Sequence, residues 1–265
     1  MILSELIHKI EEAAKLKKPV EGDNSGLIVG DATADVTKVL LALDCTQAII
    51  DEAKNHGAQL IFTHHPPIYD PIKSILPNTP VGAKITSLIK NDIALYAAHS
   101  SLDLSSIGTT ATLCEILALY DSVLTSDGMG AVGTLDEPIS LVNFTLRLAW
   151  LLKCPPIRFC GKSLKEVKKV GVCAGAGATY KSIAEMKERG ADVYVTSDIT
   201  FHMAQYALDL GLAMIDVTHY ASENPVMARL HKRFTEKIPE VEFSSSLVNG
   251  EVFKSINKNT GVLIS

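Results

Sequence analysis

The stretch Leu60-Ile61-Phe62-Thr63-His64-His65-Pro66-Pro67 joins a short apolar run to two adjacent histidines and two prolines. The apolar residues predict a buried strand, which the prolines prevent from continuing within a sheet. Side chains alternate between the faces of a strand, so a strand end at Thr63 would free the following backbone to turn both imidazoles toward one place. Ligands of α/β proteins bind at this end of a strand, and imidazole is the commonest metal ligand. A polar pair at the start of a loop is the alternative interpretation of His64 and His65.

The sequence around this stretch alternates strand, helix and strand. Residues 39–43 predict a strand, Thr46 is a suitable N-cap for a helix that ends at Gly57, and residues 58–63 predict the next strand. Residues 170–196 repeat this order. The pattern predicts an α/β fold built from two similar halves.

Two further motifs support the duplication, because each places a histidine four residues before an acid. His99 and Asp103 follow one apolar run, and His219 and Glu223 follow another. The repeat aligns these two motifs with each other and aligns the histidine pair with 197–198. We expect a pseudo-twofold axis to bring equivalent strand ends face to face, although doubly wound sheets show the same alternation without duplication.

A turn-rich stretch at 126–130 separates the two repeats. We therefore predict a first half at 1–127, with the His-His and His-x₃-Asp motifs, and a second half at 128–265, with the His-x₃-Glu motif. The loop at 69–80 is long enough to cover a site, and packing on a neighbouring subunit is an equal alternative. The basic run at 162–169 is interpreted as a solvated helix face.

Composition restricts the classes of function. The 265 residues are 47% hydrophobic. They contain no apolar run of roughly 18 residues, so we expect no membrane span. Near the N-terminus Glu5 precedes any long apolar stretch, so we expect no signal peptide. A net charge of -5 makes nucleic acid an unlikely partner. The five cysteines form no CxxC pair and predict reduced thiols in a cytoplasmic protein.

The candidate ligands favour a metal centre with two ions. His64, His65, Asp103, His219 and Glu223 supply three imidazoles and two carboxylates. Structural zinc sites close with four ligands and favour cysteine, whereas this larger set suits two adjacent divalent ions with water in the open positions. Such a centre keeps an excess of positive charge that an anionic small molecule could neutralise. The ligand types do not distinguish Zn, Mn and Fe.

Two other features have less direct interpretations. His99 is interpreted as a residue that holds a metal ligand or transfers a proton, because three other histidines already suffice for the metals. Asp198 is a candidate outer carboxylate. The glycine-rich segment 174–178 lacks the dinucleotide-binding spacing, so phosphate binding there is the less favoured interpretation.

The motifs resemble those of the Nif-three-like family, whose bacterial members are often labelled GTP cyclohydrolase one type two homologues. The matching stretches cover nearly the whole chain: Asp23-Asn24-Ser25-Gly26-Leu27, Thr63-His64-His65-Pro66, Ala98-His99-Ser100-Ser101-Leu102-Asp103 and His219-Tyr220-Ala221-Ser222-Glu223. The resemblance implies two similar α/β domains, a dinuclear metal site and a toroidal homohexamer built as a trimer of dimers. It also implies that Glu223 bridges the two metals.

The chain departs from the family pattern at two places. Thr218 stands where the family usually has glycine before the late histidine, and 197–198 are Ser-Asp where Gly-Glu is common. At 265 residues the chain resembles the short form, which lacks the domain inserted in longer members. The departures leave the five implied ligands intact.

Two functions are compatible with these features. The favoured one is a metal-dependent hydrolase acting on a nucleotide or another phosphate-bearing small molecule. The alternative is a non-catalytic metal-binding scaffold or regulatory protein that acts through protein partners. Loss of activity in Glu223→Ala, with the oligomer retained, would favour the hydrolase.

Overall fold

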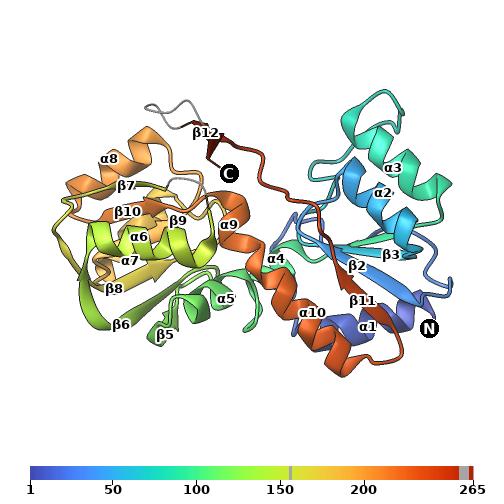
Figure 1. Cartoon of the computed structure of the whole chain (residues 1–265), viewed down its shortest axis with the longest axis horizontal. Coiled ribbons are helices and arrows are strands. Elements are labelled where there is room, and N and C mark those ends of the chain that lie inside the picture. The colour runs from blue at the N-terminus through green and yellow to red at the C-terminus, as the bar shows by residue number, and fades with distance from the viewer. Residues whose placement is uncertain (155–156, 257–262, 265) are drawn as a thin grey trace. The chain divides into compact units, whose positions relative to one another are not determined.

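The computed structural model describes residues 1–154, 157–256 and 263–264, and Figure 1 labels most of their helices and strands. The chain divides into two compact units. The first contains residues 1–108 and 226–250, and the second contains residues 109–225 and 251–265. Each unit contains its own sheet, so the predicted α/β class is confirmed.

The sheet of the first unit has the strand order β1-β4-β3-β2-β11. Its strands are β1 (Gly26–Val29), β2 (Lys38–Ala42), β3 (Leu60–Thr63), β4 (Ala94–Ala97) and β11 (Glu242–Ser245). All neighbours pair in parallel except β1, which is antiparallel to β4. The carboxyl ends of β2, β3 and β4 therefore lie along one edge, where ligands of α/β sheets bind.

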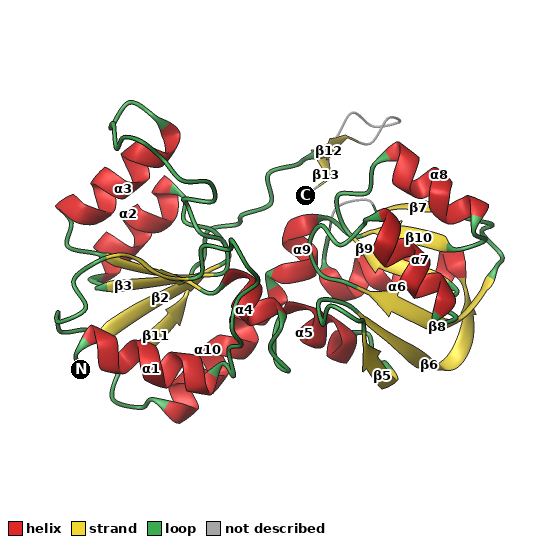
Figure 2. Ribbon diagram, turned by 180° about the vertical axis from the view of Figure 1, so that it is seen from behind, coloured by secondary structure: helices red, strands yellow, loops and turns green. Residues whose placement is uncertain are grey.

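Helices cover both faces of this sheet, as Figure 2 shows. They are α1 (Leu3–Ala13), α2 (Gln47–His56), α3 (Pro80–Lys90) and α10 (Pro225–Lys237), and the short α4 (His99–Asp103) follows β4. Apolar residues of α2 and α3 pack on one face of β2, β3 and β4. On the other face, Phe62 of β3 stacks on Tyr96 and contacts the edge of Phe234 from α10, with ring centroids 5.7 and 5.5 Å apart.

The sheet of the second unit has the order β5-β6-β8-β9-β10-β7. Its strands are β5 (Tyr120–Leu124), β6 (Ala131–Ser140), β7 (Arg158–Cys160), β8 (Glu166–Val172), β9 (Val193–Thr196) and β10 (Ala213–Asp216). Its helices are α5 (Thr109–Ile116), α6 (Leu141–Leu152), α7 (Tyr180–Glu188), α8 (Phe201–Asp209) and α9 (His219–Glu223), and β12 (Ser255–Ile256) pairs separately with β13 (Leu263–Ile264). One core joins α5 and α6 to the sheet, and another joins α7 and α8 to its other face.

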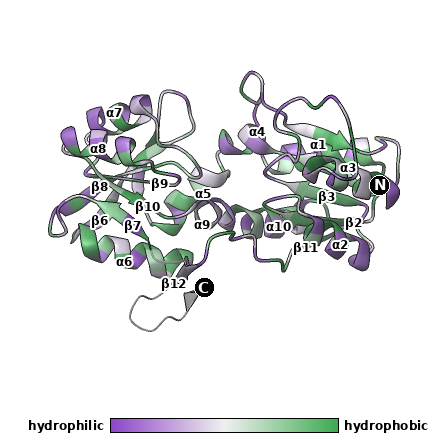
Figure 3. Cartoon of the chain, turned by 90° about the horizontal axis from the view of Figure 1, so that it is seen from above, coloured by the Kyte–Doolittle hydropathy of each residue, from purple (hydrophilic) through white to green (hydrophobic). Residues whose placement is uncertain are grey.

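Local sequence signals account for these elements. Thr46 caps α2 by accepting from Ile49 N, and Gly57 ends that helix in the left-handed region at φ 68°. Thr179 and Ser182 form a reciprocal capping box at the start of α7. The central strands β3 and β10 are fully buried and appear green, for hydrophobic residues, in Figure 3. The predicted strand, helix and strand order is therefore confirmed in both repeats.

The structure differs from the sequence-based expectations in two respects. The units do not divide at residue 127, because β11 returns to pair with β2 of the first unit and α5 packs on β6 and β8 of the second. The interpretation of 162–169 as a helix face is wrong, because β8 begins at Glu166. The lysines of this run lie partly before the strand and partly in it, where Lys168 is half-buried and Lys169 is exposed.

Candidate metal centre

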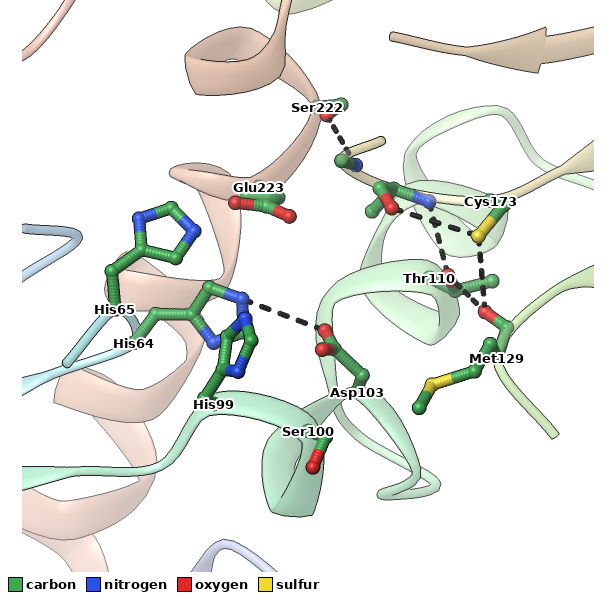
Figure 4. Close-up of polar contacts among 12 residues, drawn as sticks. His64, His65, His99, Ser100, Asp103, Thr110, Met129, Cys173, Ser222 and Glu223 are labelled. Carbon is green, nitrogen blue, oxygen red and sulfur yellow. Dashed lines mark hydrogen bonds and ion pairs between the residues drawn. The ribbon is translucent and has the colours of Figure 1, made fainter. Parts of the chain in front are cut away.

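Three histidines of the first unit gather at the carboxyl ends of β3 and β4. His64 and His65 follow β3, and their backbone N–H groups both donate to the carbonyl of Leu43, at 3.1 and 3.0 Å. This shared acceptor holds the irregular turn that the sequence predicted. One ring nitrogen from each of His64, His65 and His99 lies within 4.8 Å of the others, and Figure 4 shows the three rings pointing toward one another.

Asp103 lies beside the same cluster. It is the last residue of α4, and its Oδ1 is 3.6 Å from Nε2 of His64 (Figure 4). The His64 side chain is only 1% exposed, whereas that of Asp103 is 19% exposed. The one-turn helix after β4 thus carries His99 at its start and Asp103 at its end, and both face the histidine pair.

Carboxylates orient two of these three imidazoles. Asp44 Oδ1 lies 2.8 Å from Nδ1 of His65, and Asp23 Oδ1 lies 2.6 Å from Nδ1 of His99. A carboxylate can only accept, so the shared proton belongs to Nδ1 in each neutral ring and Nε2 keeps its lone pair. This pairing is typical of histidines that bind metals.

Asp23 is held firmly as a carboxylate. Burial by itself would raise its pKa, but hydrogen bonds from Ser100, Ser25 and His99 outweigh that effect and lower the pKa from 3.8 to about 2. Asp23 Oδ2 accepts from the hydroxyl of Ser25 at 2.6 Å and from the backbone and hydroxyl of Ser100. Asp23 therefore stays charged at neutral pH and fixes the orientation of His99.

The second unit carries a matching arrangement after β10. His219 begins the one-turn helix α9 and Glu223 ends it, with His219 Nε2 3.0 Å from Glu223 Oε2. Asp198, which follows β9, places Oδ2 2.6 Å from Nδ1 of His219. The predicted alignment of the two His-x₃-acid motifs is thus confirmed at the level of local structure, and Asp198 has the orienting position considered for it.

The glycine-rich segment after β8 supports this arrangement. Gly175 has φ +67°, and a Cβ added there would lie 2.0 Å from Oε1 of Glu223. Its N–H donates to the hydroxyl of Ser222, which donates to the carbonyl of His219. Close packing against Glu223 therefore explains why glycine is needed here.

Thr218, which departs from the family pattern, has a strained backbone. Its φ of 62° and ψ of 150° lie in a region that is essentially restricted to glycine. Its hydroxyl accepts from Ala221 N at the start of α9 and donates to Glu251 at 2.9 Å. These contacts hold the residue immediately before His219 in place.

Both sets of residues suit a divalent metal. The first unit offers imidazole nitrogens beside the Asp103 carboxylate, and the second offers His219 beside the buried carboxylate of Glu223. Imidazole with carboxylate is the donor chemistry of Zn, Mn and Fe sites. The contact of Asp44 with His65 was not predicted from the sequence. The available signal was its position shortly after β2, the strand that pairs with β3.

Two further observations concern the cysteines and the helices. All five cysteines are free, and burial raises the pKa of the Cys45 thiol to about 12. In the described part of the chain, no helix has the length and apolarity required to cross a membrane. A cytoplasmic location stays a prediction.

The fold and these residues define a class of α/β protein with histidine–carboxylate clusters at the carboxyl ends of two sheets. A family model described as Duf34/NIF3 (NGG1p interacting factor 3) matches residues 1–251. The chain belongs to this family, which confirms the resemblance seen in its motifs.

Relatives of similar length carry one shared description. A Clostridium perfringens protein described as "GTP cyclohydrolase 1 type 2 homolog" is 34% identical over 264 residues, with 97% of this chain and 100% of the relative covered. A Methanocaldococcus jannaschii protein of the same description is 35% identical over 225 residues, which cover 84% of this chain and 90% of that protein.

Solved structures share the fold over nearly the whole chain. The crystal structure of a Bacillus cereus protein related to NIF3 has a TM-score of 0.85 at 25% identity and covers 95% of this chain and 98% of that one. Reduced HcgD from Methanocaldococcus jannaschii has a TM-score of 0.80 at 32% identity, with 92% and 97% covered.

Proposed function

We propose that this protein is a metal-dependent hydrolase that acts on a nucleotide or another phosphate-bearing small molecule. Two divalent ions per chain, of Zn, Mn or Fe, would be held by His64, His65, Asp103, His219 and Glu223. The observation that carries the proposal is the pairing of histidine Nδ1 with a carboxylate in both units, at 2.8 Å for His65 and 2.6 Å for His219. Such pairs direct Nε2 toward a ligand and are a recurrent feature of metal sites.

The proposal assigns both ligand sets to one centre because each set is small by itself. His219 and Glu223 provide two ligands, whereas catalytic zinc sites use three protein ligands and two-metal sites need more. His64, His65 and Asp103 provide three. Together the five residues would give the two ions three protein ligands each, because Glu223 as the proposed bridge counts for both, and would leave positions open for substrate.

The residues of the chain have distinct roles in this proposal. When bound, the two ions would supply Lewis-acid charge for a phosphate and lower the pKa of water. Asp23 fixes the Nδ1 proton of His99, so Nε2 of His99 can accept a proton and return it. Asp44 and Asp198 keep His65 and His219 in their binding orientations. His99 would thus transfer protons and is not assigned as a metal ligand.

Metal content per chain tests the proposal. Wild type, Glu223→Gln and the control Glu188→Gln would be purified without chelator and reconstituted with Mn, Fe or Zn. Glu188 is an exposed residue of α7, so its variant controls for loss of one negative charge. We expect about two equivalents in wild type and control, and a sharp fall in Glu223→Gln. A metal content below half an equivalent per wild-type chain would contradict the proposed metal centre.

Hydrolysis is tested separately with a panel of nucleotides and phosphate esters. Glu223→Gln should lose any activity found in the wild type, and Glu188→Gln should keep it. If the metals bind and the panel shows no turnover, the non-catalytic scaffold becomes the better proposal. In that case binding to a protein partner should survive Glu223→Gln.

We also propose that the chain forms a homohexamer. The edge strand β5 supports self-association, because Tyr120, Val123 and Leu124 are 57%, 59% and 58% exposed there. Exposed apolar side chains on a sheet edge favour pairing with another chain. Light scattering would measure the mass in solution of the wild type and of Val123→Lys. A monomeric wild type would contradict the proposed homohexamer.

A further inference from the structure

A cavity in the second unit lies between the sheet and the start of α8. Its volume is about 230 Å³, and its lining includes Arg158, Cys160, Ile199, Phe201, Met214 and Asp216. β7 pairs antiparallel with β10, so that Arg158 is opposite Asp216 and Cys160 is opposite Met214. Side chains alternate along a strand, so these four residues share the face that the cavity occupies.

Arg158 is a positioned hydrogen-bond donor in this cavity. Its Nη2 forms an ion pair with the Asp216 carboxylate and lies 3.4 Å from the carbonyl of Ile199. The Arg158 side chain is 74% exposed, whereas that of Asp216 is 9% exposed. A guanidinium has five N–H donors in a rigid fork, so the two contacts fix it and leave donors for a ligand.

Phe201 supplies an exposed aromatic face beside this donor. It is the first residue of α8 and is 77% exposed. A large aromatic side chain left in water at the mouth of a cavity favours a ligand that stacks on it, and every nucleobase has a face suited to such stacking. The aromatic ring and the guanidinium together fit a flat ring with hydrogen-bond acceptors on its edge.

The volume limits what the cavity can hold. Ligand pockets for whole drug-sized molecules measure roughly 300–1,000 Å³. At about 230 Å³ the cavity is smaller than these and matches one ring system. The remainder of a larger ligand would lie outside it.

The cavity is next to the ligand set of the second unit. Ile199 directly follows Asp198, which orients His219, and Asp216 lies two residues before Thr218, whose N–H donates to Asp216 at 3.3 Å. The cavity therefore lies at the end of β10 from which α9 begins, so a ligand that occupies it can extend toward α9. This is the arrangement that a nucleotide needs if its phosphates are to reach the proposed metals.

We propose that this cavity is a nucleobase subsite, with Phe201 stacking on the base and Arg158 donating to acceptors on the edge of the base. The inference rests on the proposed hydrolase function and narrows its substrate to nucleotides. Arg158 and Phe201 are then specificity-determining residues. Asp216 is a positioning residue that holds the guanidinium.

Nucleosides test the subsite without phosphate or metal. Calorimetric titration of the metal-free full-length protein would use inosine and adenosine, which share a purine ring but present an oxo or an amino group beside N7. Arginine donates to two adjacent acceptors such as O6 and N7, so we expect inosine to bind at least about fivefold more tightly. Equal binding or a preference for adenosine would overturn the role of Arg158.

Variants locate the binding. We expect Phe201→Leu to weaken inosine binding at least about tenfold, since one base–aromatic stack is lost. Arg158→Lys keeps the charge beside Asp216 but loses the rigid fork of donors, and should reduce the preference for inosine. The controls are Arg147→Gln and Phe253→Leu, which change exposed residues elsewhere in the second unit and should bind as wild type. Equal losses in the controls would overturn the assignment.

Cys160 gives a second readout, because it lines the cavity. Burial raises the pKa of its thiol, so alkylation by iodoacetamide should be slow and should slow further when inosine is bound. Absence of inosine binding in a protein that takes up about two metal equivalents would overturn this inference alone. Inosine binding without metal uptake would instead contradict the proposed hydrolase.

Discussion

Gly175→Ala is the substitution for which the structure makes the most specific prediction. The new Cβ would lie 2.0 Å from Oε1 of Glu223, 3.1 Å from its Cδ and 3.5 Å from Nε2 of His219. Ordinary contacts of a Cβ begin at 3.4 Å, so the carboxylate oxygen must move by about 1.4 Å. The Glu223 side chain is 6% exposed and is hemmed in by its neighbours. The substitution therefore displaces the proposed bridging ligand.

Two separate magnitudes follow for this variant. The left-handed backbone, at φ +67°, costs alanine about 1–2 kcal/mol of folding free energy. The displaced carboxylate costs metal affinity, and we expect a loss of at least tenfold, since disturbing even an orienting neighbour of a ligand typically costs about 10–100-fold.

Gly57→Ala separates the two effects. Gly57 has nearly the same φ, +68°, and nothing lies within 4 Å of an added Cβ. Urea unfolding of the metal-free proteins should show a loss of stability in both variants, and the loss should be larger for Gly175→Ala because its Cβ also displaces a buried side chain. Competition with a chromogenic chelator should show weaker metal binding for Gly175→Ala alone. A folded Gly175→Ala protein with wild-type metal affinity would refute the assignment of Glu223 as a ligand.

Three further substitutions test the arrangement. Thr218→Gly should be about 1–2 kcal/mol more stable than Thr218→Ala in urea, because only glycine relieves the backbone strain at φ 62°; equal stabilities would contradict the strain. Asp44→Asn should weaken metal binding about 10–100-fold in a chelator competition by releasing His65, whereas Asp51→Asn on the exposed face of α2 should not. The pKa of Asp23 is lowered in the folded state, so its contribution to stability is present above pH 3.8 and is lost as pH falls through about 2. In metal-free protein the difference in unfolding free energy between wild type and Asp23→Asn should shrink by at most about 2 kcal/mol from pH 7 to pH 2; a constant difference would contradict this.

The sequence alone determined the α/β class and most of the central elements. Alternating apolar runs, Thr46 as an N-cap and Gly57 as a helix stop are local signals, and the local structure obeys them. The two His-x₃-acid motifs were equally readable, because four residues are one turn of a helix and bring both side chains to one side.

The first half of β8 was not readable as a strand. β8 begins among lysines whose spacing imitates an exposed helix face, and its pairing with β6 and β9 overrides that local pattern. The partition of the chain also depends on pairing, since β11 joins the first sheet from a distant part of the sequence. The propensity of a segment to form a strand does not specify which strand it pairs with, so the sequence pattern does not identify the neighbouring strand.

Only the tertiary structure decided how the candidate ligands are supported. Asp23 and Asp44 lie far along the chain from the histidines they orient, 76 residues in one case and 21 in the other. The glycine-rich segment 174–178 was visible in the sequence, yet the packing of Gly175 against Glu223 depends on two segments that meet only when the sheet forms. Hydrogen bonds and close contacts between distant segments require the fold to set their distances, whereas turns, caps and one-turn motifs are fixed by bonds along the chain.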